Sequence, residues 1–316
     1  MARTFVLVAS NPYSGSTLLA SLLGSHPEVT TVGGISSARR ERDIHAFLCS
    51  CGRPMLECPF WREIRARMRA GGYPDFELDN FRLGFDYGGG SLISRLRSGS
   101  LRWAWLESAR DALLHLSPAH EARLSAIGRR NADFARHVLE LTGANVLLDT
   151  SKERMRARYL FDRLPMHGRA IHLVRDPRGV VDSSLRRGRS RGDARRAAIA
   201  WSRTNAAIER AIRRLPADRR TMVRYEELCR DPSGTLEGLY RFIGVSPQPS
   251  ATDAWPEHLL GNSIRLRGRT EIVLDERWRA SLEPDQLRQI NGAIGPAGRR
   301  LYPMPLAPVA TGGVEG

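Results

Sequence analysis

The sequence has no long hydrophobic run and few cysteines, and each shortage excludes a class of protein. No run approaches the roughly 18 apolar residues that would span a membrane. The apolar stretch in MARTFVLVAS at residues 1–10 is also too short for the hydrophobic region of a signal peptide. Four cysteines in 316 residues do not make a secreted disulfide framework. We therefore expect a soluble, cytoplasmic protein with reduced thiols and no membrane span.

The chain is strongly basic but lacks the signatures of nucleic-acid recognition. Its 49 Lys and Arg residues against 34 Asp and Glu residues give a formal charge of +15, which favours anionic partners. We find no zinc finger, no RNA-binding aromatic signature and no basic stripe interleaved with aromatic residues. We therefore expect an anionic cofactor or substrate and no nucleic-acid partner.

The pattern of apolar residues predicts an α/β fold. The 41% hydrophobic content is enough to bury a core. Buried strands are predicted at 4–9, 144–149, 169–174 and 220–225, and helical patterns between them include 16–23, 119–141 and 195–215. This alternation predicts a central, mainly parallel β-sheet flanked by helices, with ligands bound beyond the carboxyl ends of the strands.

The chain is predicted to form a single domain over residues 1–304. The Gly-, Ser- and Asp-rich stretch at 71–100 is weakly periodic, which indicates an insertion or substrate-side lid at about 71–118. Residues 305–316 are typical of a flexible C-terminal tail.

A polar loop, within SNPYSGSTLL at 10–19, follows the first predicted strand and precedes a helix. A nucleotide triphosphatase loop would read G-x-x-x-x-G-K-[S/T], and its lysine is missing here, which disfavours ATP hydrolysis. What remains is a short anion cradle of Ser14, Gly15, Ser16 and Thr17 at the N-terminus of a helix. The alternative interpretation is an ordinary capped turn.

A second polar segment, HLVRDPRGVVDSS at 172–184, follows a later predicted strand. Asp176 and Pro177 form a helix start, with the aspartate as cap. Arg175 at the strand end and a hydroxyl of Ser183 or Ser184 two turns later would suit a phosphate monoester. An ion pair between Arg175 and a neighbouring carboxylate is the alternative.

Taken together, these two segments resemble the sulfotransferases that use 3′-phosphoadenosine 5′-phosphosulfate (PAPS), and the bacterial members in particular. The resemblance runs from residue 4 to about 303 and includes LCSCGRPMLECPFW at 48–61, LLDTSKERMRARYL at 147–160, VRYEELCRDP at 223–232 and HLLGNSIRLRGR at 258–269. It implies a P-loop-like α/β fold. It also implies transfer of a sulfuryl group from PAPS to a hydroxyl or amine of a small-molecule or glycan-like acceptor, with no metal required.

The resemblance also implies roles for individual positions. Ser14 to Thr17 fall on the loop that holds the 5′-phosphosulfate, next to Tyr13. Arg175 and Ser183 fall on the pair that holds the 3′-phosphate. Lys152 matches a lysine that points toward the transferring group in related enzymes, although its local sequence taken alone is more typical of a solvated lysine at a helix start. A late basic loop over the 3′-phosphate corresponds to Arg265, Arg267 and Gly268.

Two departures from the family pattern affect the chemistry. Tyr13 stands where many relatives have a basic residue, and a phenol supplies no charge at neutral pH. Gly34 stands where relatives often have a glutamate base, just after the first helix and a short second strand. Candidate replacement bases are His45, Glu41 and Asp43.

The missing base leaves two alternatives within the family. An acidic hydroxyl or an amine as acceptor would need little or no base, and a degenerate enzyme would bind the cofactor without turnover. Outside the family, an ATP-dependent phosphotransferase and a non-catalytic binder of nucleotide or nucleic acid stay open.

Three cysteines lie close together in the sequence, at positions 49, 51 and 58. With His45 or Cys229 as a fourth ligand they could bind a structural zinc ion. Their spacing is not that of a standard finger, so we favour small buried residues packed under Phe60 and Trp61, with no metal.

Overall fold

The computed structural model describes residues 3–35, 43–85, 104–152, 154–188, 193–249, 256–260, 266 and 272–303. Its strands are β1 (Thr4–Ser10), β2 (Val29–Thr31), β3 (Val146–Asp149), β4 (His167–Val174) and β5 (Arg220–Arg224). Its α-helices are α1 (Ser16–Leu23), α2 (Pro59–Ala70), α4 (Ala104–His115), α5 (Pro118–Thr142), α6 (Arg154–Tyr159), α7 (Pro177–Arg186), α8 (Ala194–Ile212), α9 (Tyr225–Arg230), α10 (Pro232–Ile243), α11 (Trp278–Ser281), α12 (Pro284–Ala293) and α13 (Pro296–Leu301). Short 3-10 turns are η2 (Phe161–Arg163) and η3 (Ala217–Arg219).

The described strands form one parallel sheet in the order β2-β3-β1-β4-β5. In this register Leu7 of β1 lies opposite Asp149 of β3, and Ser10 lies opposite Leu173 of β4. The predicted α/β fold and the four predicted strands are thereby confirmed. The fifth strand, β2, is only three residues long, too short to show a period in the sequence.

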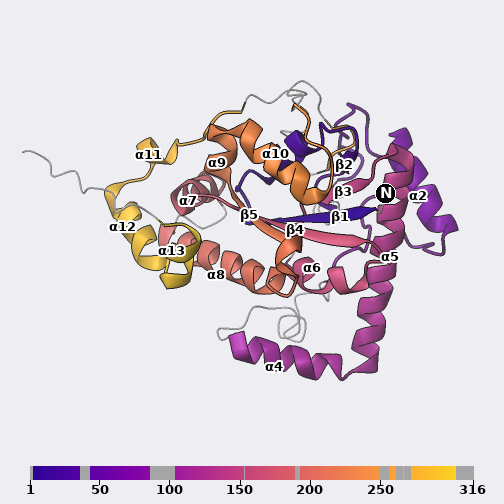
Figure 1. Ribbon diagram of the computed structural model, residues 1–316, viewed down its shortest axis with the longest axis horizontal. Helices are drawn as coiled ribbons and strands as arrows, with labels where there is room; N and C mark the ends of the chain where they lie inside the picture. Colours follow the sequence, from indigo (N-terminus) through magenta and orange to yellow (C-terminus); the bar gives the residue numbers. More distant parts are fainter. Residues whose placement is uncertain are drawn as a thin grey trace, which may run out of the picture.

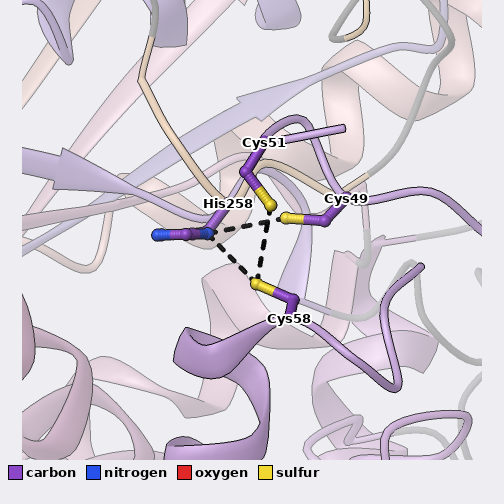
Figure 2. A group of neighbouring side chains, drawn as sticks. All are labelled: Cys49, Cys51, Cys58 and His258. Atoms are coloured by element: carbon purple, nitrogen blue, oxygen red, sulfur yellow. Dashed lines mark hydrogen bonds between the residues drawn. The ribbon is translucent and has the colours of Figure 1, made fainter. Parts of the chain in front are cut away.

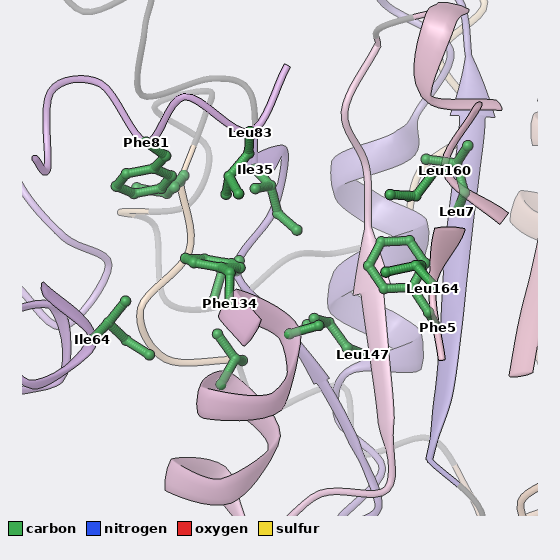
Figure 3. Close-up of a cluster of buried hydrophobic side chains, with 14 of the residues drawn as sticks. Phe5, Leu7, Ile35, Ile64, Phe81, Leu83, Phe134, Leu147, Leu160 and Leu164 are labelled. Carbon is green, nitrogen blue, oxygen red and sulfur yellow. The ribbon is translucent and has the colours of Figure 1, made fainter. Parts of the chain in front are cut away.

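The side chains of β1 alternate between two cores, one on each face of the sheet. Phe5 and Leu7 belong to the core that α5, α6 and α8 cover, and Figure 3 shows these side chains beside Leu160 and Leu164. Val6 and Val8 belong to the core under α1, α9 and α10. Figure 1 shows α8 and α10 on opposite sides of the strands. Helices on both faces leave the carboxyl ends of the strands open to bind a ligand.

The predicted start of α7 at Asp176 and the helical pattern predicted at 195–215 are confirmed. The Asp176 carboxylate caps α7 by accepting a hydrogen bond from the Arg178 N–H at 2.8 Å, with Pro177 as the first helical residue. Trp201, Asn205 and Ile208 are 1%, 1% and 3% exposed, so they form the inner face of α8. Both elements therefore form where local sequence placed them.

The predicted insertion at 71–118 contains α4. Its residues 86–103, like the predicted tail at 305–316, lie outside the described part of the chain. Among the described helices, none is long and apolar enough to cross a membrane.

A fully buried ion pair fixes the end of β3. Arg156 Nε donates to Asp149 Oδ2 at 2.7 Å, and both side chains are 0% exposed. Arg156 Nη1 also donates to the Leu83 carbonyl at 2.8 Å. Asp149 Oδ1 accepts from the N–H groups of Ser151 and Ile35, at 2.8 and 3.3 Å. A buried charge is tolerated only when it is paired in this way, so the turn after β3 depends on this pair.

We expect Arg156→Met to lower the free energy of unfolding by about 3–5 kcal/mol, because it leaves the Asp149 carboxylate buried without its partner. Arg241→Met is the matched control. Arg241 pairs with Glu237 but is 66% exposed, and its loss should change stability by no more than about 0.5 kcal/mol. Urea unfolding followed by circular dichroism measures both variants. Equal effects of the two substitutions would contradict the assigned role of the buried pair.

Candidate functional site

The loop between β1 and α1 has a strained backbone. Tyr13 has φ 67° and Gly15 has φ 85°, both in the left-handed region that L side chains rarely adopt. A Cβ on Gly15 would lie 2.5 Å from Cδ2 of Tyr225. Residue 15 must therefore be glycine, because its φ is positive and because a Cβ would clash with the Tyr225 ring. Backbone strain of this kind often marks a binding site.

The hydroxyl of Ser14 is buried in this loop and has no hydrogen-bond partner among the described residues. Ser14 is 1% exposed and Ser16 is 3% exposed. Gly15 caps α1 without a side-chain hydrogen bond, so the first turn of this helix keeps N–H donors that no described side chain caps. An unpaired hydroxyl beside a helix N-terminus is chemically suited to an anion.

Arg175 lies at the end of β4, next to this loop. Its Nη1 donates to the Tyr13 carbonyl at 2.9 Å, and its Nη2 donates to the Asp275 carbonyl at 2.8 Å and lies 3.1 Å from the Asp275 carboxylate. The guanidinium carbon is 4.5 Å from the centre of the Tyr225 ring. The ion pair that the sequence left open for Arg175 is therefore present. Its role toward a phosphate stays a prediction.

Asp275 and Tyr225 keep fixed charge states around Arg175. Hydrogen bonding to Arg277, together with the charge of Arg175, holds the pKa of Asp275 well below its usual range. Burial raises the pKa of Tyr225 to about 12, so its phenol stays protonated at neutral pH. The phenol donates to the Val273 carbonyl and accepts from the Asp275 N–H, at 3.1 and 3.2 Å. The segment 273–275 is thereby joined to the site.

Ser183 lies two turns into α7 and is 7% exposed. Its hydroxyl accepts a hydrogen bond from Arg186 Nη2 at 3.4 Å. Another arginine of this region, Arg187, lies over the Tyr13 ring, 5.3 Å from its centre. Where the loop lacks a basic residue, the end of α7 thus brings a cation to Tyr13.

Lys152 lies in the turn after β3, and its side chain is exposed. Because β3 and β4 flank β1 in a parallel sheet, the Lys152 turn and Arg175 emerge on either side of the polar loop. The Thr150 N–H donates to the Gly33 carbonyl at 3.1 Å, which ties this turn to the segment after β2. The sequence motifs around 14–17, 152 and 175 therefore meet at one edge of the sheet.

The other predicted site residues are not brought to this edge by any described contact. His45 is exposed in the turn at 43–46, where its N–H donates to the Asp43 carboxylate at 2.9 Å. Glu41, Arg265, Arg267 and Gly268 lie outside the described residues. The roles of all five residues stay predictions.

Two supporting residues of the site were not identified from the sequence as such. Asn11 Nδ2 donates to the Trp201 carbonyl at 3.2 Å, and Trp201 Nε1 donates to the Arg175 carbonyl at 3.1 Å. Trp201 thus forms hydrogen bonds both with the segment after β1 and with the segment after β4. Its helical spacing indicated a core position, which is correct, but no local signal shows the hydrogen bonds that a tryptophan N–H makes across 26 residues.

The cysteines of the 48–58 segment lie together, as their sequence spacing suggested, but the predicted fourth residue is wrong. The residue that joins Cys49, Cys51 and Cys58 is His258, whereas Cys229 is placed elsewhere, 4.0 Å from the Val273 carbonyl, and His45 is not part of the group. His258 was missed because it lies 200 residues from Cys58.

A parallel α/β sheet with a polar anion-type loop after its central strand defines the P-loop-like class of proteins. Within that class, the family model described as "Sulfotransferase family" matches residues 104–249 of the chain. The matched region contains Lys152, Arg175 and Ser183. The family resemblance drawn from the sequence motifs is thereby confirmed.

Among known proteins, carbohydrate sulfotransferase 5 of Mus musculus is 27% identical to the chain over an alignment of 158 residues. The match covers 41% of this chain and 40% of that protein. The chain therefore aligns with less than half the length of this relative.

Solved structures similar to the chain include two sulfotransferase domains. The domain from the Synechococcus PCC 7002 olefin synthase is 22% identical, with 92% of this chain and 93% of that chain covered and a TM-score of 0.46. The domain from the curacin biosynthetic pathway is 16% identical, with 92% and 96% covered and a TM-score of 0.49.

We expect Gly15→Ala to lower stability by about 1–3 kcal/mol, because the added methyl meets the Tyr225 ring and the residue must keep a positive φ. Gly238→Ala is the control, since Gly238 lies in α10 with open space around it, and it should be neutral or stabilising by about 0.5–1 kcal/mol. Thermal or urea unfolding compares the two. A Gly15→Ala protein as stable as the parent would show that the loop is not constrained.

Proposed function

We propose that the chain transfers a sulfuryl group from PAPS to a hydroxyl or amine of a small-molecule or carbohydrate acceptor. The match of residues 104–249 to the sulfotransferase family model supports sulfuryl transfer in general. The observation that carries the proposal is the buried, unpartnered hydroxyl of Ser14, in a loop flanked by Arg175 and the Lys152 turn. An anionic donor would satisfy that hydroxyl and meet a cation on either side.

The residues present fit the phosphate groups of PAPS. Ser14, Ser16 and Thr17 offer hydroxyls, and Gly15 leaves the backbone open to close approach because it has no Cβ. These residues would hold the 5′-phosphosulfate, with Tyr13 beside them. The tyrosine cannot supply the positive charge that relatives have there, and Arg187, which lies over its ring, is a candidate to supply it.

Arg175 and Ser183 would hold the 3′-phosphate. A guanidinium has five N–H donors, so the bonds to Tyr13 and Asp275 leave Arg175 with donors for a ligand. The same bonds fix its orientation before any ligand binds, which lowers the entropic cost of binding. Arg265, Arg267 and Gly268 belong to the same proposed subsite through the family resemblance alone.

Lys152 is proposed as the cation that stabilises the transition state. It is the only lysine among the 49 Lys and Arg residues of the sequence, and all the others are arginine. An ammonium is a compact point charge that can approach one oxygen, whereas a guanidinium is a planar fork. The sequence otherwise uses arginine for its basic residues. A lysine at this turn is therefore consistent with a specific requirement for an ammonium group there.

PAPS supplies a sulfuryl group bonded to a phosphate that departs with added negative charge. The protein has little covalent chemistry to perform, so positioned cations and N–H donors provide most of the rate enhancement. Lys152 would neutralise the developing charge, and the N-terminus of α1 would assist it. Gly34 leaves the base unassigned. His45 and Glu41 are the proposed candidates, and an amine acceptor would need no strong base.

The acceptor class has one line of support. The relative from Mus musculus is named as a carbohydrate sulfotransferase, which favours a sugar hydroxyl among the acceptors to be tested. The segments at 35–47 and 71–118 are proposed to form the acceptor pocket.

A thermal-shift titration with adenosine 3′,5′-bisphosphate, ADP, and ATP with magnesium tests the donor. We expect only the 3′,5′-bisphosphate to stabilise the protein, by about 2.7 kcal/mol at a hundredfold excess over its dissociation constant. Equal or greater stabilisation by ATP with magnesium would favour a phosphotransferase instead. No stabilisation by any of the three would remove nucleotide binding from the proposal.

The single lysine also allows its role to be tested without a known acceptor. An amine-reactive N-hydroxysuccinimide ester should modify Lys152 and the α-amino group only. We expect bound PAPS to slow acylation of Lys152 about tenfold at a tenfold excess over the dissociation constant, because the occupied site covers the amine. Mass spectrometry follows both positions, and the α-amino group is the internal control.

The same role predicts a kinetic outcome once an acceptor is found. Lys152→Met should lower kcat by about 10²–10³-fold with little change in PAPS affinity. Arg241→Met, which removes an exposed cation from α10, should have no effect. Two results would exclude Lys152 from the reaction. One is acylation of Lys152 that saturating PAPS does not slow, and the other is normal turnover of the Lys152→Met variant.

A further inference from the structure

Four side chains of the kinds that bind zinc point toward one centre beside the sheet. Cys49 and Cys51 come from the loop at 48–54, Cys58 precedes α2, and His258 comes from the separate segment 256–260. Their ligand atoms all lie within 4.8 Å of one another. Figure 2 shows the three sulfurs and the histidine ring converging.

Three of the six distances between these atoms match those of a tetrahedral zinc site. Zinc bonds of about 2.3 Å to sulfur and about 2.0–2.1 Å to nitrogen place tetrahedral ligands about 3.8 Å apart for two sulfurs and about 3.6 Å apart for sulfur and nitrogen. Here the Cys51 and Cys58 sulfurs are 3.7 Å apart. His258 Nδ1 is 3.5 Å from the Cys49 sulfur and 3.4 Å from the Cys58 sulfur.

Ordinary core packing or a disulfide explains this arrangement less well. A disulfide needs sulfurs about 2.05 Å apart, and all four cysteines are free thiols. Cys49 and Cys58 are 0% exposed, so a core position would suit them as small apolar residues. It would not explain why an imidazole nitrogen and the more exposed Cys51 sulfur turn toward the same point.

The loop around Cys49 holds its sulfurs in place through backbone hydrogen bonds. The Cys49 N–H donates to the Arg53 carbonyl at 2.8 Å, and the Gly52 N–H donates back to the Cys49 carbonyl at 2.9 Å. Gly52 has φ 84°, which closes this turn without strain. Cys58 is the N-cap of α2, so the start of this helix fixes the position of its sulfur.

The His258 ring is positioned by one aromatic neighbour and by one carboxylate. Its plane stacks on Phe60, with centroids 4.4 Å apart and an interplanar angle of 1°. Nδ1 faces the sulfurs while Nε2 lies 3.4 Å from the Glu257 carboxylate. Histidines that bind metals commonly donate their second N–H to a carboxylate in this way. His258 also has φ 66°, a strained value that fits a functional constraint.

We propose that Cys49, Cys51, Cys58 and His258 bind one structural zinc ion. Four protein ligands complete a tetrahedron and leave no open position for a substrate or a reactive water, so the ion is structural and not catalytic. This site replaces both the packing role favoured for the cysteines from the sequence and the predicted fourth ligands His45 and Cys229.

The ion would link parts of the chain that are remote in sequence. The Leu259 N–H donates to the Ser50 hydroxyl at 2.8 Å, and the Leu260 N–H donates to the Val32 carbonyl at 2.8 Å. The metal would therefore join the cysteine loop and α2 to a segment that pairs with the end of β2. Loss of the ion should loosen this end of the sheet.

Metal analysis of the full chain tests the proposal. The protein is expressed in zinc-supplemented medium and purified without chelators, and its zinc content is measured by plasma mass spectrometry. We expect about one zinc per chain in the parent and in Cys229→Ser, the matched control. We expect loss of zinc in Cys51→Ser, which removes an exposed residue and little packing. His258→Asn should also lose zinc while tolerating the positive φ.

Two further measurements do not depend on the variants folding. Cobalt substitution of the parent should give the thiolate charge-transfer and d–d bands of a tetrahedral site. A chelator should lower the melting temperature by roughly 5 °C or more, with recovery when zinc is restored. Absence of zinc and of cobalt bands in the parent would overturn the proposal. So would unchanged zinc in both site variants, or a Cys51–Cys58 disulfide in the fresh protein.

Discussion

The buried guanidinium of Arg175 is the interaction on which the arrangement of the candidate site depends. A charge this deeply buried must be paired, and Arg175 meets that demand by bonding to the Tyr13 carbonyl and to Asp275 while stacking on Tyr225. It thereby joins the loop after β1, the end of β4 and the 273–275 segment. The strained backbone at Tyr13 and Gly15 persists because these surroundings hold it.

Two ion pairs with buried arginines flank the central strand and give the site its layout. Asp149 and Arg156 fix the turn that carries Lys152, on the β3 side of β1, and Arg175 and Asp275 fix the loop on the β4 side. Each arginine is paired with an aspartate that neutralises its charge. Neither arginine is therefore an unpaired surface charge that would attract any anion. The polar loop lies between the two supports, which explains how a short sequence without the usual lysine can still be held in one conformation.

The cysteine cluster lies outside this edge and stabilises a different part of the molecule. Its ligands join α2 and its preceding loop to the 256–260 segment, which pairs with the backbone at Val32 and Gly33. Gly33 has φ 77°, and a Cβ there would lie 2.3 Å from the Leu260 carbonyl oxygen. The glycine therefore serves close backbone packing at the position just before Gly34, where relatives often carry a glutamate. The proposed zinc would act on stability through this contact, separately from sulfuryl transfer.

The sequence by itself determined the parallel α/β fold, four of the five described strands, the cap of α7 and the order of the family motifs, because each depends on residues within about ten positions of one another. It also indicated that Ser14 to Thr17, Lys152 and Arg175 follow strands of one parallel sheet, and strand ends of such a sheet share an edge. Only the tertiary structure decided that Arg175 pairs with Asp275, that Trp201 bonds to its carbonyl, and that His258 completes the cysteine group. These contacts join positions 100, 26 and 200 residues apart, for which no local pattern exists. The short strand β2 was expected from the family pattern alone, since three residues are too few to show a period.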